Sequence, residues 1–317
     1  MRDTKIFFAT DIHGSDVCLK KFLNAGTFYG VDAVVMGGDI TGKMIVPIVE
    51  ESPDEYVAHL FGRRRAVDST GLPGLHKFIA DAGFYGHHMT PEEMAALRAD
   101  PAAVDELFQK LMTQTMSHWV DLAEDRLGGT GIEVIFAPGN DDPLFIDDVL
   151  SGSSVVVNPD SRVVELPGGF PMISVGYSNR TPWDSPRELD EADLRKVIDE
   201  EVAKLADPRR AVFNLHVPPK NTPIDQAMEL DAEFRPVVKG GSPVIAGVGS
   251  SAVRDAIATY QPMMSLHGHI HESRGEARIG KTIALNPGSE YSEGVLRGVI
   301  ITLSQKKGLR GYQLVSG

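Results

Sequence analysis

Short apolar runs separated by polar, helix-compatible segments dominate the first 40 residues of the chain. Residues 6–9 and 33–36 are apolar without alternation, which is typical of strands buried on both faces. The segment between them, residues 15–25, has apolar side chains at helical spacing and predicts a covering helix. A strand, a helix and a second strand in this order predict a parallel pair of strands in an α/β fold.

The same pattern returns in the second half of the chain. Strands are predicted at 133–137, 211–215 and 263–267, and weaker alternating strands at 162–166 and 172–175. Helices are predicted over 188–205 and from Ser250 or Ser251 to Tyr260. The last strands, at 282–285, 299–303 and 312–315, have no helical spacers, so we expect them to pair antiparallel at a sheet edge.

Residues 43–131 interrupt this regularity, and we interpret them as an insertion within a single domain spanning 1–317. A strand at 44–49 contains Pro47, and Thr90 followed by Pro91 is typical of a helix start. A long amphipathic helix follows, with an apolar stripe over 104–122. We therefore expect a largely helical cap or association subdomain, whose stripe offers a route to a homo-oligomer.

Side chains that can bind metal follow directly after five of the apolar runs. They are Asp11 and His13, Asp39, Asn140, His216, and finally His269 and His271. In open α/β sheets ligands bind beyond the carboxyl ends of the strands, so we expect these side chains to meet. Seven donors exceed the three or four protein ligands of a single zinc-like ion, and they suit two ions that share one carboxylate.

Composition narrows the class of protein. The chain has 317 residues, a net charge of −13 and one cysteine, Cys18. A negative surface repels phosphate backbones and anionic lipids, so no nucleic-acid partner, nuclease activity or membrane association is expected. A single cysteine excludes a cage of thiolate ligands. The sequence opens on a strand and has no long apolar run, which leads us to expect a cytoplasmic protein.

The donor series resembles the calcineurin-like metallophosphoesterase superfamily, in particular a bacterial and archaeal branch related to cyclic-nucleotide phosphodiesterases. The matching pieces are Asp11-Ile12-His13, Gly38-Asp39, Gly139-Asn140-Asp141-Asp142, His216 and Gly268-His269-Ile270-His271. The resemblance implies a two-sheet β-sandwich flanked by helices (αββα). It also implies two divalent ions (manganese, iron or zinc). One ion is held by Asp11, His13 and His271 and the other by Asn140, His216 and His269, with Asp39 bridging them.

The activity that the resemblance implies is hydrolysis of a small phosphate ester by a metal-bridging hydroxide, with Asp39, Asn140 and Asp141 as catalytic residues. Many members have His where this chain has Asp141. A carboxylate there repels a dianionic monoester more than a monoanionic diester, so a phosphodiesterase is favoured. A phosphomonoesterase or nucleotidase, and a scaffold without turnover, are the alternatives. Asp142 is expected to orient a ligand, and Asn179, Arg180 and Arg64 are candidate substrate contacts.

Overall fold

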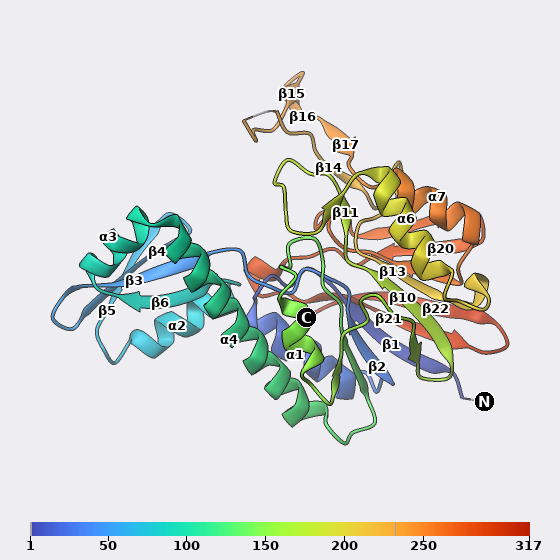
Figure 1. The fold of residues 1–317 in the computed structure, drawn as a ribbon, viewed down its shortest axis with the longest axis horizontal. Coiled ribbons are helices and arrows are strands. Elements are labelled where there is room, and N and C mark those ends of the chain that lie inside the picture. Colours follow the sequence, from blue (N-terminus) through green and yellow to red (C-terminus); the bar gives the residue numbers. More distant parts are fainter. Residues whose placement is uncertain (1, 232) are drawn as a thin grey trace.

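The computed structural model describes residues 2–231 and 233–317 and contains two six-stranded sheets packed face to face (Figure 1). The first sheet has the order β22-β21-β1-β2-β7-β8. Its strands are β1 (Thr4–Ala9), β2 (Ala33–Met36), β7 (Glu133–Phe136), β8 (Val156–Val157), β21 (Arg297–Ser304) and β22 (Gly308–Ser316). The second sheet has the order β19-β20-β18-β13-β10-β9. Its strands are β9 (Val164–Leu166), β10 (Phe170–Val175), β13 (Val212–Leu215), β18 (Met264–Leu266), β19 (Gly275–Ile279) and β20 (Thr282–Asn286).

Helices cover the outer face of each sheet, which gives the expected αββα layers. The helices α1 (Asp16–Phe28), α4 (Pro101–Leu127) and α5 (Ile146–Ser151) cover the first sheet, and α6 (Glu191–Val202) and α7 (Ser251–Tyr260) cover the second. Strand β1 shows why its apolar run is continuous. Ile6 and Phe8 pack between the sheets, whereas Phe7 and Ala9 pack against the helices.

Strand pairing confirms most of the predicted topology. Strands β1, β2 and β7 are parallel, as are β10, β13 and β18, so their carboxyl ends face one edge of each sheet. Strands β21 and β22 pair antiparallel at an edge, as expected. The expectation was wrong for β20, which pairs parallel with β18. Strand β19, which is antiparallel to β20, connects the two parallel strands β18 and β20 in place of the helix that usually makes such a connection.

The insertion forms a separate lobe, on the left of Figure 1, that contains a sheet as well as helices. The sheet has the order β5-β4-β3-β6, from β3 (Ile45–Ser52), β4 (Glu55–Leu60), β5 (Arg63–Val67) and β6 (Tyr85–Met89). It packs with α2 (Leu72–Asp81) around a small core of its own, beside α3 (Pro91–Ala99). The predicted cap at Thr90 is confirmed, because its hydroxyl accepts from the Glu93 amide.

The long helix α4 packs against the body along one face. Met116, Trp119 and Ala123 are fully buried against α1 and the first sheet. The indole of Trp119 donates a hydrogen bond of 2.9 Å to Asp16. Within the stripe predicted over 104–122, Trp119 is buried while Phe108, Leu111 and Leu122 are half-buried, and homo-oligomerisation through this stripe stays a prediction.

A small arm projects from the body between β13 and α7, at the top of Figure 1. It consists of the short strands β14 (Gln226–Met228), β15 (Val238–Lys239), β16 (Ser242–Pro243) and β17 (Ile245–Gly247). A pair of two-residue strands, β11 (Ser178–Asn179) and β12 (Glu188–Leu189), closes the loop beside it. None of the helices in the described part of the chain is long and apolar enough to cross a membrane.

Candidate metal centre

The sequence-predicted donors converge at the facing carboxyl ends of the two parallel sets of strands. Asp11, His13 and His271 form one group, whose ligand atoms lie within 4.8 Å of one another. The Nε2 atoms of His13 and His271 are 3.0 Å apart, and His271 Nε2 is 3.4 Å from Asp11 Oδ1. The first group therefore joins the end of β1 to the loop after β18, across the sandwich.

Asp39, His216 and His269 form the second group. His216 Nε2 lies 3.4 Å from Asp39 Oδ2, and His269 Nδ1 lies 2.7 Å from Asn140 Oδ1. The same Oδ2 atom of Asp39 is 3.6 Å from His13 Nε2, so this carboxylate stands between the two groups. All seven predicted donors are thus brought together.

The spacing of these atoms fits metal ligation. Ligands about 2.0–2.2 Å from one cation, at tetrahedral or octahedral angles, lie roughly 3.0–3.5 Å from each other. The separations of 3.0 and 3.4 Å within the groups fall in this range. His13 Nδ1 and both ring nitrogens of His216 are buried and have no hydrogen-bond partner among the residues that the structure describes. Such atoms are costly unless something binds them, so the donor set fits divalent cations.

Burial and neighbouring charges set the protonation of the donors. Burial lowers the pKa of His13 well below its usual value and that of His269 to about 4, so both rings are neutral and can bind metal. Burial alone would raise the pKa of Asp39, but the charge of His216 holds it well below the ordinary range. For His216, burial is outweighed by Asp39 and Asp11, which raise its pKa to about 9. Because only the neutral ring binds metal, a cation bound between Asp39 and His216 would displace the proton from His216.

The backbone beneath the donors is strained. Asp11, His13, Asp39 and His269 have φ angles of 55°, 39°, 52° and 66°, in the left-handed region that non-glycine residues rarely adopt. Gly38 also has a positive φ, and a Cβ atom there would collide with the His216 ring. Conformations of this kind cost free energy and persist where the surroundings over-determine them, often at functional sites.

Two buried charged residues hold the donor loops in place. The Asp142 carboxylate accepts hydrogen bonds from the amides of Ile40, Thr41 and Gly139 at 2.7–3.1 Å. It therefore joins the loop of Asp39 to that of Asn140. Arg187, 1% exposed, donates to the carbonyl of Asp142 at 2.8 Å. The predicted orienting role of Asp142 agrees with these contacts, whereas Arg187 was not predicted.

Comparison with known proteins supports this assignment of the fold. No family model matches the chain. An uncharacterized protein of Methanocaldococcus jannaschii, MJ1162, is 30% identical over 158 residues, which span 49% of this chain and 64% of that protein. A solved structure with 16% identity and a TM-score of 0.56 covers 99% of both chains. TT1561 of Thermus thermophilus, with 12% identity and a TM-score of 0.53, covers 100% of this chain and 99% of its own.

The chain shares its overall fold with these two solved structures, and its αββα layers agree with the fold that the sequence resemblance predicts. An archaeal phosphodiesterase and a 5'-nucleotidase precursor of Thermus thermophilus also align with 99% of this chain, each at 11% identity, with TM-scores of 0.36 and 0.41. This chain covers 54% of the nucleotidase precursor.

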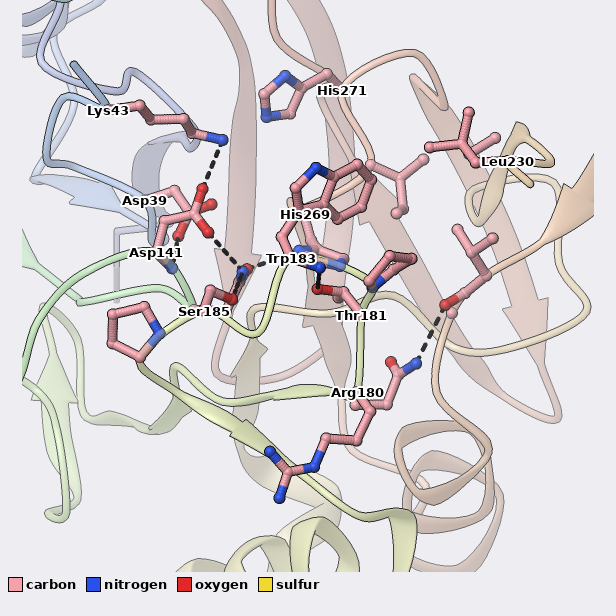
Figure 2. Close-up of a pocket in the computed structure, with 18 of the residues that line it drawn as sticks. Asp39, Lys43, Asp141, Arg180, Thr181, Trp183, Ser185, Leu230, His269 and His271 are labelled. Carbon is pink, nitrogen blue, oxygen red and sulfur yellow. Dashed lines mark hydrogen bonds and ion pairs between the residues drawn. The ribbon is translucent and has the colours of Figure 1, made fainter. Parts of the chain in front are cut away.

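Asp141 directly follows Asn140, at the position where the sequence resemblance leads us to expect His. Lys43 approaches it, with Nζ 2.5 Å from Asp141 Oδ2 (Figure 2). The Asp141 amide donates to Asp39 at 2.9 Å. Burial and the neighbouring Asp39 raise the pKa of Asp141. Burial alone would lower the pKa of Lys43, but Asp39 and Asp141 raise it. Lys43 was missed in the sequence, although its place four residues after Asp39 was a usable signal.

The structure places two of the three candidate substrate contacts at the cleft and the third away from it. Asn179 and Arg180 line the cleft in front of the donors. The Arg180 guanidinium points away from Asp39 and Asp141 in Figure 2 and pairs with Asp190 at 3.1 Å. Arg64 is not brought to the cleft. It lies on β5, in the insertion, and pairs with Glu51 and Glu55.

Proposed function

We propose that this chain is a metal-dependent phosphoesterase that hydrolyses phosphodiesters at a dinuclear centre. The convergence of seven donors between the two sheets carries the proposal. Asp11, His13 and His271 would hold one ion, and Asn140, His216 and His269 the other, with Asp39 contacting both. Mixed carboxylate, amide and imidazole ligands suit manganese, iron or zinc. When bound, such ions supply Lewis acidity, which lowers the pKa of a water molecule and stabilises negative charge on phosphoryl oxygens.

The reaction exchanges one ester bond for a hydroxyl. The oxygen of a water molecule forms a bond to phosphorus, the bond from phosphorus to one ester oxygen breaks, and that oxygen leaves with a proton. Lys43 is the ammonium group beside the donors, and a charge-assisted hydrogen bond from it would stabilise charge on a phosphoryl or leaving oxygen. Asp141 holds this ammonium in place.

The preference for a diester follows from the charge beside the donors. Asp141 adds a carboxylate at the point where many proteins of this fold have an imidazole, and it neutralises Lys43 through their 2.5 Å contact. Arg180, which also lines the cleft, is paired with Asp190. With Lys43 and Arg180 each balanced by a carboxylate, little net positive charge is left for the second charge of a monoester dianion. A monoanionic diester has no second charge to balance.

The test compares bis-p-nitrophenyl phosphate with p-nitrophenyl phosphate, using protein stripped of metal and reloaded with manganese. We expect about two bound ions per chain by elemental analysis and kcat/KM at least about tenfold higher for the diester, a difference of about 1.4 kcal/mol. In Asp141→Asn the ratio should shift toward the monoester, because the repelling carboxylate is gone. Faster hydrolysis of the monoester would make the chain a phosphomonoesterase. Metal binding without turnover of either ester would indicate a scaffold protein without catalytic activity.

A further inference from the structure

A cleft of about 1100 Å³ adjoins the donor cluster. Part of its wall is formed by donors, among them Asp39 and His271, and much of the rest is apolar. The apolar side chains come from α4, the turn before α5, the loop between β11 and β12, and the arm, and include Phe108, Met112, Phe145, Trp183, Met228 and Leu230. Ligand cavities commonly measure about 300–1,000 Å³, so this one holds far more than a phosphate with two small ester groups.

The charges along the cleft disfavour a second anionic group on the ligand, because carboxylates outnumber Lys220, the one lining cation without an ion pair among the described residues. Among the described lining residues the cations are Lys43, Arg180 and Lys220, and the first two are already paired with Asp141 and Asp190. Three carboxylates line the cleft away from the donors, namely Asp105, Glu229 and Glu272. A polyphosphate or an acidic substituent would be repelled there. The part of the ligand that fills the cleft should therefore be uncharged.

Trp183 is the most exposed aromatic side chain of the cleft wall, with 64% of its surface accessible. Its loop is nevertheless fixed. The buried Glu188 carboxylate accepts hydrogen bonds from the amides of Thr181 and Ser185 at 2.9 and 3.0 Å. The Ser185 hydroxyl accepts from Asn140 Nδ2 at 2.8 Å, so the indole is two residues from a contact with a proposed metal ligand (Figure 2). An exposed ring on a fixed loop loses little entropy when a ligand covers it.

A second exposed ring reinforces this surface. Phe234, from the arm, is 51% exposed, and its ring centroid is 6.1 Å from that of Trp183. The two planes are inclined by 39°. Phe234 is not itself a lining residue, but it extends the aromatic surface that Trp183 offers at the cleft wall, where flat π-systems can pack.

We propose that the cleft selects phosphodiesters bearing one flat, uncharged aromatic group, and that Trp183 contacts that group directly. The phosphodiester part rests on the function proposed above, while the preference for an aromatic group rests on the cleft itself. Aryl and nucleoside esters share this chemistry. Alkyl esters of lipid type do not, and they serve as the discriminating probes.

The first test measures binding without turnover. Dimethyl-, dibutyl- and diphenylphosphinate are monoanions that have no ester bond to break, and they differ only in the groups on phosphorus. With manganese-loaded protein, calorimetry should give a Kd for diphenylphosphinate at least about tenfold below that for dimethylphosphinate. The dibutyl compound should lie near the dimethyl one. Trp183 is one of only two tryptophans, so its fluorescence should respond to the diphenyl compound alone.

Variants assign the effect to the indole. In Trp183→Ala the diphenyl-to-dimethyl preference should fall below about threefold, and Trp183→Phe should keep most of it. Phe28→Ala is the matched control, because Phe28 is 80% exposed on α1 and does not line the cleft. It should behave as the wild type. Equal binding of the three phosphinates, or an unchanged preference in Trp183→Ala, would overturn the proposal. If dibutylphosphinate binds as tightly as the diphenyl compound, the proposal is also wrong, because the cleft then selects apolar groups in general and not aromatic ones.

The second test separates this proposal from the proposed function. The p-nitrophenyl esters of methyl and phenyl phosphate have the same leaving group, so their ratio of kcat/KM reports the second substituent alone. We expect the phenyl ester to be favoured about tenfold in the wild type and less than about threefold in Trp183→Ala. If the protein binds phosphinates selectively but hydrolyses neither ester, the proposed function is wrong and the aromatic preference is supported. Hydrolysis of both esters at equal rates would do the reverse.

Discussion

The donor centre and the insertion are built in opposite ways. Each donor loop is held by other segments: Asp142 joins the loops of Asp39 and Asn140, and the amide of His269 donates to Asp11 at 2.9 Å. In the insertion, Arg64 meets only the nearby carboxylates Glu51 and Glu55, and all of these side chains are about half exposed. Residues in the donor centre are therefore held by several contacts from distant segments. Charged residues on the sheet of the insertion, such as Arg64, pair with residues near them in sequence. Equivalent substitutions should have very different effects in the two regions.

The largest difference between the two regions should appear when one carboxylate is neutralised in each, at two aspartates with similar backbone conformations. Asp39 and Asp54 both have left-handed φ angles, of 52° and 61°, and Asp54 lies at the turn between β3 and β4 of the insertion. We expect Asp39→Asn to lower kcat/KM on an aryl phosphodiester at least about a thousandfold and to reduce bound metal, since this carboxylate would contact both ions.

Asp54→Asn, in contrast, should keep kcat/KM within about twofold, because asparagine tolerates the left-handed region. Steady-state kinetics, metal analysis and circular dichroism on both variants check the pair. An Asp39→Asn enzyme with activity within about tenfold of the wild type would contradict the proposed dinuclear centre.

A smaller effect should come from Asp142, the buried carboxylate that joins the loops of Asp39 and Asn140. Asp142→Asn would replace one acceptor oxygen with an NH₂ group that faces amide donors. We expect a loss of roughly 2–4 kcal/mol in the free energy of unfolding and a roughly 10- to 100-fold loss of metal affinity. Asp68→Asn is the counterpart in the insertion. Asp68 also accepts a backbone hydrogen bond, from Gly71 at 2.9 Å, but at the surface, so the loss of stability in Asp68→Asn should be much smaller than in Asp142→Asn. Urea unfolding gives both values, and equal losses would erase the contrast between the regions.

Glu188 tests whether the loop of Trp183 belongs with the fixed centre. Burial alone would raise its pKa, but hydrogen bonds from Ser185 and Thr181 hold it below the usual 4.5. A lowered carboxyl pKa stabilises the fold above pH 4.5, and this stability is lost as the pH falls through the folded value. We expect Glu188→Gln to cost roughly 1–2 kcal/mol at pH 7.

The difference in melting temperature between the wild type and Glu188→Gln should shrink as the pH is lowered from about 5 toward about 4. A difference that stays constant across this range would show that the charge of Glu188 does not fix the loop.

The same contrast explains how far the sequence could be interpreted. Strands such as β1 are buried on both faces, and their donors follow within a few residues, so local pattern was enough to predict them. Strand β5 is exposed along nearly its whole length, so no alternation indicated a strand, and the arm contains strands of two or three residues. The approach of Lys43 to Asp141 depends on the path of two distant loops. Contacts of that kind leave no periodic signal in either segment.

The smallest effect should come from Arg64, a sequence candidate for phosphate binding. Exposed ion pairs contribute little, because solvent screens them and the side chains lose entropy in forming them. Arg64→Ala should therefore leave the midpoint of urea unfolding unchanged and alter kcat/KM by less than about twofold. Stopped assays over a range of substrate concentrations separate the two kinetic constants. A roughly fivefold rise in KM with unchanged kcat would mean that β5 also reaches bound substrate, in addition to Lys43 and Phe108 of the insertion, which already line the cleft.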